Sequence, residues 1–169
     1  AKLEPSDGQI YDNFGAAVAV YDGVIVVGSP RDDGSSSGSY YYDAGSAYVY
    51  ERSGSSYNWT LASKLEPPST SSNPSYKQFG ASVSVSGDFI VVGPKDDIMM
   101  SYGYQERVYA FVRSSDGWYE HQHITAADGS SYDLFGASAA LSEENLVIGS
   151  RYDDDSGSSS GSAHAFSLV

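Results

Sequence analysis

The sequence contains no cysteine, few basic residues and no long hydrophobic run, and each of these absences excludes a class of protein. Without cysteine, the chain cannot form a disulfide framework, a zinc–thiolate or iron–sulfur site, or a cysteine nucleophile. Nine basic against 22 acidic side chains give a net charge of −13, which argues against nucleic acid and anionic membranes as partners, since both require clustered Lys and Arg. No apolar run approaches the roughly 18 residues of a spanning helix, and residues 1–5 show no signal-peptide pattern. We therefore expect neither nucleic-acid binding nor membrane insertion.

Small and flexible residues are abundant: glycine, serine and proline together make up 56 of the 169 residues. A third of a chain in these types is the range in which disorder becomes a serious expectation. The 15 tyrosines and the repeated runs of valine and isoleucine argue for a folded chain instead, because disordered segments are poor in both. The length allows one domain.

Three internal repeats organise the chain. The dipeptide Phe-Gly followed by Ala occurs three times, at Phe14-Gly15, Phe79-Gly80 and Phe135-Gly136. Thirteen residues after each Phe stands Val or Ile followed by glycine, at Gly28, Gly93 and Gly149. Shorter matches accompany them: Lys-Leu-Glu-Pro at 2–5 and 64–67, Asp-Gly at 7–8 and 128–129, and Gly-Ser-Ala at 45–47 and 161–163. The Phe residues lie 65 and 56 positions apart, so each unit has about 60 residues, and we place the units at 1–63, 64–123 and 124–169.

Each unit is predicted to form four short β-strands. The first strand, at 14–20, 79–85 and 135–141, alternates larger apolar side chains with Gly, Ala or Ser, which is the period of two typical of a strand. The second, at 24–27, 89–92 and 145–148, is mostly apolar throughout and is expected to be covered on both faces. The third, at 47–50, 108–111 and 163–166, alternates small with large side chains, so that the small face of one sheet would receive the aromatic face of the next. The fourth begins near Trp59 and Trp118 and runs into Leu65 and Ile124, and the third unit lacks it.

Repeated four-stranded sheets of this kind are the blades of a β-propeller, so the predicted fold class is all-β. The combination of Phe-Gly-Ala, Asp-Gly or Gly-Asp, Val-Val-Gly, an Asp-Asp loop and Gly-Ser-Ala-Tyr-Val-Tyr closely resembles the FG-GAP repeat, the unit of integrin-α-like propellers. The resemblance covers essentially the whole chain in three copies. It implies β-propeller blades and a location outside the cell or on its surface.

Three blades are too few to close a ring, because propellers usually have about four to eight. Residues 1–3 match the end of a fourth strand, and the sequence ends at Val169, just after a third strand. We therefore expect either a fragment of a longer propeller or a protomer whose blades are completed by a neighbour. The predicted partner is the chain itself, in a ring or a filament, or the rest of a longer propeller.

Acidic loops after the second strand are the candidate metal sites. They contain Asp32, Asp33, Asp96, Asp97, Asp153, Asp154 and Asp155. Carboxylates suit calcium, a hard cation that takes about six to eight oxygen ligands. The resemblance implies a calcium loop of the pattern Asp-x-Asp-x-Asp-Gly between the first two strands, but the turns at 21–23, 86–88 and 142–144 lack that pattern. We therefore expect these aspartates to cap turns, with calcium binding as the alternative.

The enzyme-like motifs lack the context that their chemistry needs. Gly-x-Ser-x-Gly surrounds Ser36 and Ser159, but neither serine precedes a predicted helix, so the strained strand-to-helix turn of a nucleophilic serine is missing. His121 and His123 share one strand face and supply only two ligands of a metal site, and His164 replaces the tyrosine of the first two units as a packing ring. The sequence therefore predicts a protein that is not an enzyme.

Two further features bear on binding and on location. Asn58-Trp59-Thr60 is a usable N-glycosylation sequon at the start of a fourth strand. Five tyrosines lie in predicted loops, where they would either form a protein or glycan interface or cover the open flank of the array: Tyr40, Tyr41, Tyr42, Tyr102 and Tyr104. The leading hypothesis is an extracellular structural or adhesive propeller that assembles with itself or with neighbouring domains. The alternative is a recognition module for calcium or glycan.

Overall fold

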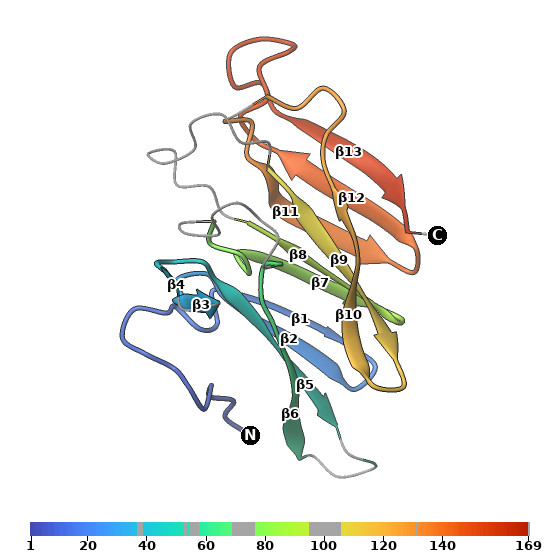
Figure 1. The fold of residues 1–169 in the computed structure, drawn as a ribbon. Helices are drawn as coiled ribbons and strands as arrows, with labels where there is room; N and C mark the ends of the chain where they lie inside the picture. The colour runs from blue at the N-terminus through green and yellow to red at the C-terminus, as the bar shows by residue number, and fades with distance from the viewer. Residues whose placement is uncertain are drawn as a thin grey trace.

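The computed structural model describes residues 1–36, 39–52, 54, 58–68, 77–94, 106–130 and 132–168, and over these residues it contains strands, turns and loops but no helix. The strands form three antiparallel sheets and one short hairpin. Figure 1 shows the sheets as successive layers, coloured blue to teal, green to yellow, and orange to red. Within the described ranges, no helix is long and apolar enough to cross a membrane.

The three sheets correspond to the three sequence repeats. The first blade contains β1 (Ala17–Tyr21), β2 (Val24–Ser29), β5 (Ser46–Arg52) and β6 (Trp59–Leu65), in that order. The second contains β7 (Ser82–Ser86), β8 (Phe89–Gly93), β9 (Val108–Ser114) and β10 (Gly117–Ile124). The third contains β11 (Phe135–Ser142), β12 (Asn145–Ser150) and β13 (Ser162–Ser167). The predicted fold class is confirmed: the chain is an all-β array of three propeller blades that does not close a ring by itself.

The loop predicted at Tyr40 and Tyr41 is wrong. Both residues lie in β4 (Ser39–Tyr41), which pairs with β3 (Gly34–Ser36) in a short hairpin after β2. The Gly- and Ser-rich composition of this stretch carries no alternation of apolar and polar side chains, so the sequence offers no strand signal there.

The Phe-Gly landmark forms a left-handed turn that precedes β1 and β7 and lies in the first residues of β11. The glycines Gly15, Gly80 and Gly136 have φ values of 92, 92 and 95°, a region that favours glycine. The residue before each Phe is left-handed as well, with φ values of 58, 50 and 56° at Asn13, Gln78 and Leu134. Because of this turn, β1 and β7 begin three residues after their Phe, later than the sequence predicts.

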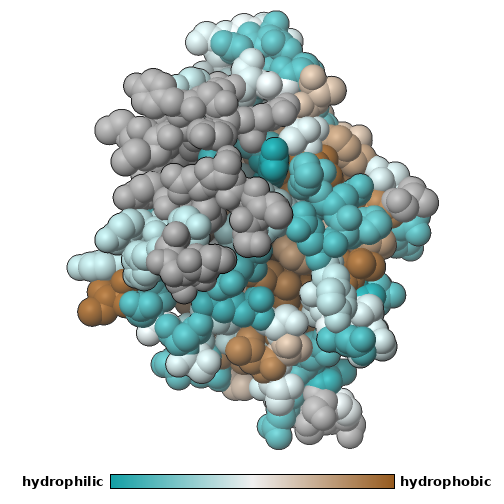
Figure 2. All heavy atoms as spheres, in the orientation of Figure 1, coloured by the Kyte–Doolittle hydropathy of each residue, from teal (hydrophilic) through white to brown (hydrophobic). Residues whose placement is uncertain are grey.

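The hydrophobic core lies mainly between neighbouring blades. One cluster joins the first two blades, with Val49 of β5 among the rings of Tyr109 and Phe111 on β9. A second cluster joins the second and third blades, with Ala110 of β9 beside Phe166 of β13. The predicted stacking of a small-residue face on an aromatic face is therefore confirmed. On the molecular face drawn in Figure 2, hydrophilic residues predominate and hydrophobic residues form separate patches.

Candidate functional site

The junction between successive blades is built on a glycine that ends the second strand. A Cβ atom at Gly28 would lie 1.9 Å from the carbonyl oxygen of Gly80, in the Phe-Gly turn of the next blade. At the following junction, a Cβ atom at Gly93 would lie 2.4 Å from the carbonyl oxygen of Gly136. Contacts this short exclude any side chain, so glycine allows each Phe-Gly turn to seat directly against the preceding blade.

Serine hydroxyls add hydrogen bonds at the second junction. Ser82 Oγ donates to the carbonyl oxygen of Gly136 at 2.7 Å. Two residues further along β7, Ser84 Oγ accepts a hydrogen bond from the backbone N–H of Leu141 at 3.0 Å. Ser86 Oγ accepts from the backbone N–H of Glu143 at 2.8 Å. The side chains of β7 thus bind the first strand of the third blade along its length.

The outward face of the first blade exposes positions that are buried inside the array. Val18 and Val20 of β1 are 68% and 70% exposed. Val85, which has the same place in the second blade as Val20 in the first, is only 6% exposed because it packs on the first blade. The face nevertheless has a partial cover, since Leu3 and Trp59 pack on the cluster formed by Val27, Tyr48 and Tyr50.

The outward face of the third blade shows the complementary exposure. Val147 of β12 is 47% exposed, whereas the corresponding residues Val26 and Val91 in the first two blades are both 0% exposed. Ala163 and Ala165 of β13 are also exposed, although their counterparts in β5 and β9 are fully buried. The described array therefore ends in a large-residue face on one side and a small-residue face on the other.

A buried polar cluster ties the N-terminal segment to the first blade. The Asp32 carboxylate receives Ser46 Oγ at 2.5 Å and Lys64 Nζ at 2.7 Å. Lys64 Nζ also lies 2.7 Å from Asp7 Oδ2 in the N-terminal segment. The Tyr48 hydroxyl lies between the two acids, 2.9 Å from Asp7 Oδ1 and 3.0 Å from Asp32 Oδ2.

The charges in this cluster explain its pKa shifts. Burial alone would lower the pKa of Lys64, but its hydrogen bonds to Asp32 and Asp7 raise that pKa above the usual 10.5. The hydrogen bond from Lys64 holds the pKa of Asp7 below its usual 3.8. Burial, followed by the charge of Asp32, raises the pKa of the Tyr48 hydroxyl. The single ammonium of Lys64 bridges two carboxylates, one in the N-terminal segment and one in the first blade, so the cluster acts as a structural clamp.

The third blade repeats this cluster with a histidine in place of the tyrosine. Asp153 Oδ2 accepts Ser162 Oγ at 2.5 Å, and Ser162 Oγ lies 3.1 Å from His164 Nε2. His164 Nδ1 in turn lies 4.0 Å from Asp128 Oδ1. The order Ser, His, Asp is that of a catalytic triad, but the serine proton is directed to Asp153 and the His–Asp distance exceeds hydrogen-bond reach. The geometry supports a structural role, and the His164 ring packs on Phe135 as the sequence predicts.

Sequence reasoning missed the partners in these clusters. Four partners were not predicted to lie beside the acidic loops: Asp7 and Asp128 of the repeated Asp-Gly motif, Ser162 of Gly-Ser-Ala, and Lys64 of Lys-Leu-Glu-Pro. Those motifs were the available signal.

The remaining acidic and tyrosine candidates divide between described and undescribed parts of the chain. Asp33 accepts hydrogen bonds from the Tyr40 hydroxyl at 2.6 Å and from the backbone N–H of Asp43 at 2.9 Å. The backbone N–H of Asp155 donates to Asp153 Oδ1 at 3.0 Å, as in a capped turn. Asp154 is exposed. Four candidates lie outside the described residues: Asp96, Asp97, Tyr102 and Tyr104.

No metal centre is assembled in the part of the chain that the structure describes. There, no three side chains among His, Cys, Asp and Glu converge as a ligand set. His121 packs against Phe89 and His123 against Tyr109, with ring centroids 6.0 and 6.4 Å apart.

Two tyrosines and the sequon asparagine are accessible. Tyr40 and Tyr42 are exposed and meet edge to face, with ring centroids 5.1 Å apart. They do not belong to the cluster that covers the first blade. Asn58 is exposed immediately before β6.

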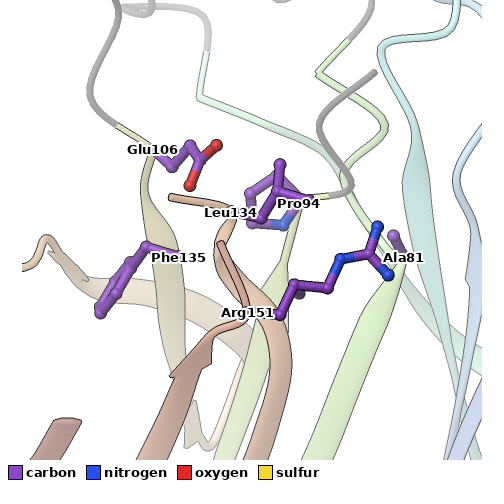
Figure 3. A pocket seen from close by; sticks show the side chains of 7 residues that line it. Ala81, Pro94, Glu106, Leu134, Phe135 and Arg151 are labelled. Atoms are coloured by element: carbon purple, nitrogen blue, oxygen red, sulfur yellow. The ribbon is translucent and has the colours of Figure 1, made fainter. Parts of the chain in front are cut away.

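The two candidate serines lie in a hairpin and a loop, apart from the surface hollow between the second and third blades. Ser36 ends β3 of the hairpin, and Ser159 lies in the loop before β13. A hollow of about 150 Å³ opens between the second and third blades (Figure 3). It is lined by Ala81, Pro94, Glu106, Leu134, Phe135, Ala137 and Arg151. Among the described residues, this lining contains one carboxylate and one guanidinium and no hydroxyl, thiol or imidazole.

Comparison with known sequences agrees with the geometry. The sequence model of the FG-GAP repeat matches residues 1–50 and 118–166, which is more than half of the chain. The second match begins on β10, the outer strand of the second blade, and runs through β13. No curated protein sequence matches the chain.

Proposed function

The chain belongs to the FG-GAP repeat family, and from that premise we propose that it is a non-enzymatic assembly module whose outward blade faces bind further blades. FG-GAP repeats form β-propeller-type modules, are generally non-catalytic, and are typical of extracellular or surface proteins. The proposed role is accordingly a structural or adhesive one outside the cell.

The exposure of the two outward faces carries this proposal. Each face presents apolar side chains whose equivalents at the internal junctions are buried, such as Val20 against Val85 and Val147 against Val91. Burying a valine side chain stabilises an assembly by roughly 1.5–3 kcal/mol, so these positions favour contact with another blade.

The net charge of the chain works against association. Each chain carries a net charge of −13, so two copies repel one another at low ionic strength. The exposed valines, alanines and serines of the two faces carry no charge. Association is therefore expected to strengthen as salt screens the repulsion, the reverse of the behaviour of an interface held by ion pairs.

Sedimentation velocity of the whole chain, across protein and salt concentration, tests the proposal. Species larger than the 18.0 kDa chain that grow with concentration and salt are expected, with rings or filaments in electron micrographs. A compact 18.0 kDa monomer that persists at high concentration and binds no other FG-GAP blade would refute it.

A second candidate, glycan recognition, is favoured by the exposed tyrosine pair. Tyr40 and Tyr42 present aromatic surface beside the Asp33 carboxylate, and this combination suits a sugar ring and its hydroxyl groups. A glycan array probed with the native chain and with Tyr42→Ala distinguishes the candidates. Binding that this substitution abolishes, while the assembly state stays unchanged, would support recognition.

A further inference from the structure

Resting on the proposed assembly function and naming its partner, we infer that a second copy of this chain docks on the third blade. In this arrangement, the Phe-Gly turn of the second copy's first blade seats against Gly149. The contact repeats, between two chains, the junction that the second blade makes with the third.

The third blade presents a receptor that has no occupant in the described structure. Ser138 and Gly149 have the same places in the third blade as Ser82 and Gly93 in the second, where they hold the Gly136 carbonyl. The three atoms nearest to a Cβ atom placed at Gly149 all belong to Ser138, with Oγ at 2.5 Å. The Ser138 hydroxyl can rotate out of this contact, whereas the backbone carbonyl of a docked Phe-Gly turn cannot, so docking is the stronger reason for glycine at this position.

The first blade presents the matching turn. Gly15 and Gly80 have the same φ value, 92°. Each also donates its N–H to the carbonyl oxygen of the glycine that ends the second strand of its own blade: Gly15 to Gly28 at 3.0 Å, and Gly80 to Gly93 at 3.1 Å. No atom lies within 4 Å of a Cβ atom placed at Gly15, so this turn has its seated conformation but faces open space.

The side chains around the turn also agree with this register. The backbone N–H of Leu141 in the third blade donates to Ser84 Oγ of the second blade. On the free faces, Val20 corresponds to Leu141 and Ala140 corresponds to Ser84. Val20 and Ala140 are both exposed. In the head-to-tail register, Val20 of one copy therefore lies beside Ala140 of the other.

The N-terminal segment fits the same arrangement. Leu3 packs on the cluster that contains Tyr48 and Tyr50. In the same way, Leu65, the last residue of β6, packs in the cluster that contains Tyr109 and Phe111 of the next blade. Residues 2–5 also repeat the sequence Lys-Leu-Glu-Pro that ends the outer strand of the first blade. β13 is an edge strand of its sheet, so residues 2–4 of the docked copy would add to that edge as β6 adds to β5.

Two copies of the described three-blade array, joined at both faces, contain six blades, within the range of about four to eight in which propellers close. Each copy contributes one turn and one receptor, so the two junctions are identical and leave neither face exposed.

Site-directed crosslinking tests this register, and the absence of native cysteine removes background reaction. Val20→Cys and Ala140→Cys are made as separate single variants, mixed at a salt concentration that favours association, and treated with a short bismaleimide. A covalent species of twice 18.0 kDa is expected in the mixture and not with either variant alone. A matched control pairs Ala140→Cys with Thr60→Cys, which lies on the outer strand β6 and should not crosslink.

Gly149→Ala supplies an independent test that leaves the blade intact. Within the chain, the added methyl group displaces only the exposed Ser138 hydroxyl. In the assembly, it would collide with the carbonyl oxygen of Gly15 in the docked copy, which should lower the association constant about 100-fold. Circular dichroism of the dilute variant verifies its fold.

The outcomes separate the inference from the proposed function. If the native chain assembles but the mixed variants crosslink no more than the control, or if Gly149→Ala assembles normally, the head-to-tail register is wrong while assembly stands. If the native chain does not self-associate but binds another FG-GAP blade, only the inference is wrong; if it does neither, both are wrong.

Discussion

Replacing Gly28 with alanine should split the first blade from the second. The added methyl carbon would stand 1.9 Å from the carbonyl oxygen of Gly80, and real Cβ atoms essentially never approach closer than 3.0 Å. The obstacle is backbone, and the N–H of Gly80 is itself bound to Gly93 O at 3.1 Å. The turn therefore cannot rotate away as a side chain would, and the blades must separate by about 1.1 Å, the difference between those two distances.

The expected loss of stability follows from that separation. A gap of this size forfeits about a quarter to a half of the dispersion energy of each contact across it. Overpacking of a close-packed junction costs about 1–3 kcal/mol, and a backbone obstacle places Gly28→Ala at the upper end. The substitution also lowers the conformational entropy of the unfolded chain, which offsets the loss of stability by about 0.4–1 kcal/mol. The net loss should be about 2–3 kcal/mol, which lowers the melting temperature by roughly 5–10 °C for a chain of this size.

Equivalent glycines make an internal comparison possible in one assay. Thermal melts of dilute protein, followed by far-ultraviolet circular dichroism, are compared for Gly28→Ala, Gly93→Ala and Gly149→Ala. Gly93→Ala should resemble Gly28→Ala, since its methyl group would meet Gly136 O at 2.4 Å and Ser82 Oγ at 2.2 Å. Gly149→Ala should be neutral or stabilising by about 0.5 kcal/mol, because no other blade lies against it within the described chain.

The result that refutes this reasoning is an equal response at all three positions. If Gly28→Ala melted at the temperature of Gly149→Ala, the junction glycines would not be required by contact between blades. Their recurrence would then need a different cause, such as the geometry of the strand end itself.

Three further predictions concern the charged clusters. Lys64→Met should lower stability to chemical denaturation by about 2 kcal/mol, because it leaves the buried Asp32 carboxylate without its cation; an unchanged midpoint would contradict the clamp. Because Lys64 holds the pKa of Asp7 below 3.8, the unfolded chain binds a proton at higher pH than the folded chain. The stabilisation that comes from the Asp7–Lys64 pair should therefore be complete above about pH 5 and be lost as the pH falls through the lowered pKa of Asp7. Denaturation midpoints should accordingly depend less on acid pH in Lys64→Met than in the native chain. Millimolar calcium should leave the melting temperature at its value in EDTA, since both oxygens of Asp153 already accept hydrogen bonds; a rise that Asp153→Asn removes would reveal a calcium site.

The strands and their stacking could be predicted from the sequence because the repeats supply the same pattern three times. Each Phe-Gly landmark positions the first strand, and the alternation of Ala47 and Val49 with larger residues identifies the face that receives the next blade. Such patterns depend on local spacing, which a sequence shows directly.

The polar clusters could not be predicted in the same way. Asp7 and Lys64 are 57 residues apart, and they meet only because the N-terminal segment runs beside the end of β6. The position of that segment depends on tertiary packing of Leu3 and Phe14, which carries no period of its own. The β3–β4 hairpin was missed for a related reason, since its serines and glycines do not alternate with apolar residues.

The two-sided blade has a consequence for how such chains grow. Since every blade carries a turn on one face and a glycine receptor on the other, a gene segment encoding one blade can duplicate in tandem without any new contact having to arise. The daughter blade already fits its parent, in the manner of repeats that contact only their neighbours. Blade number can then change by whole units during evolution, and selection need act only on the loops that differ between copies.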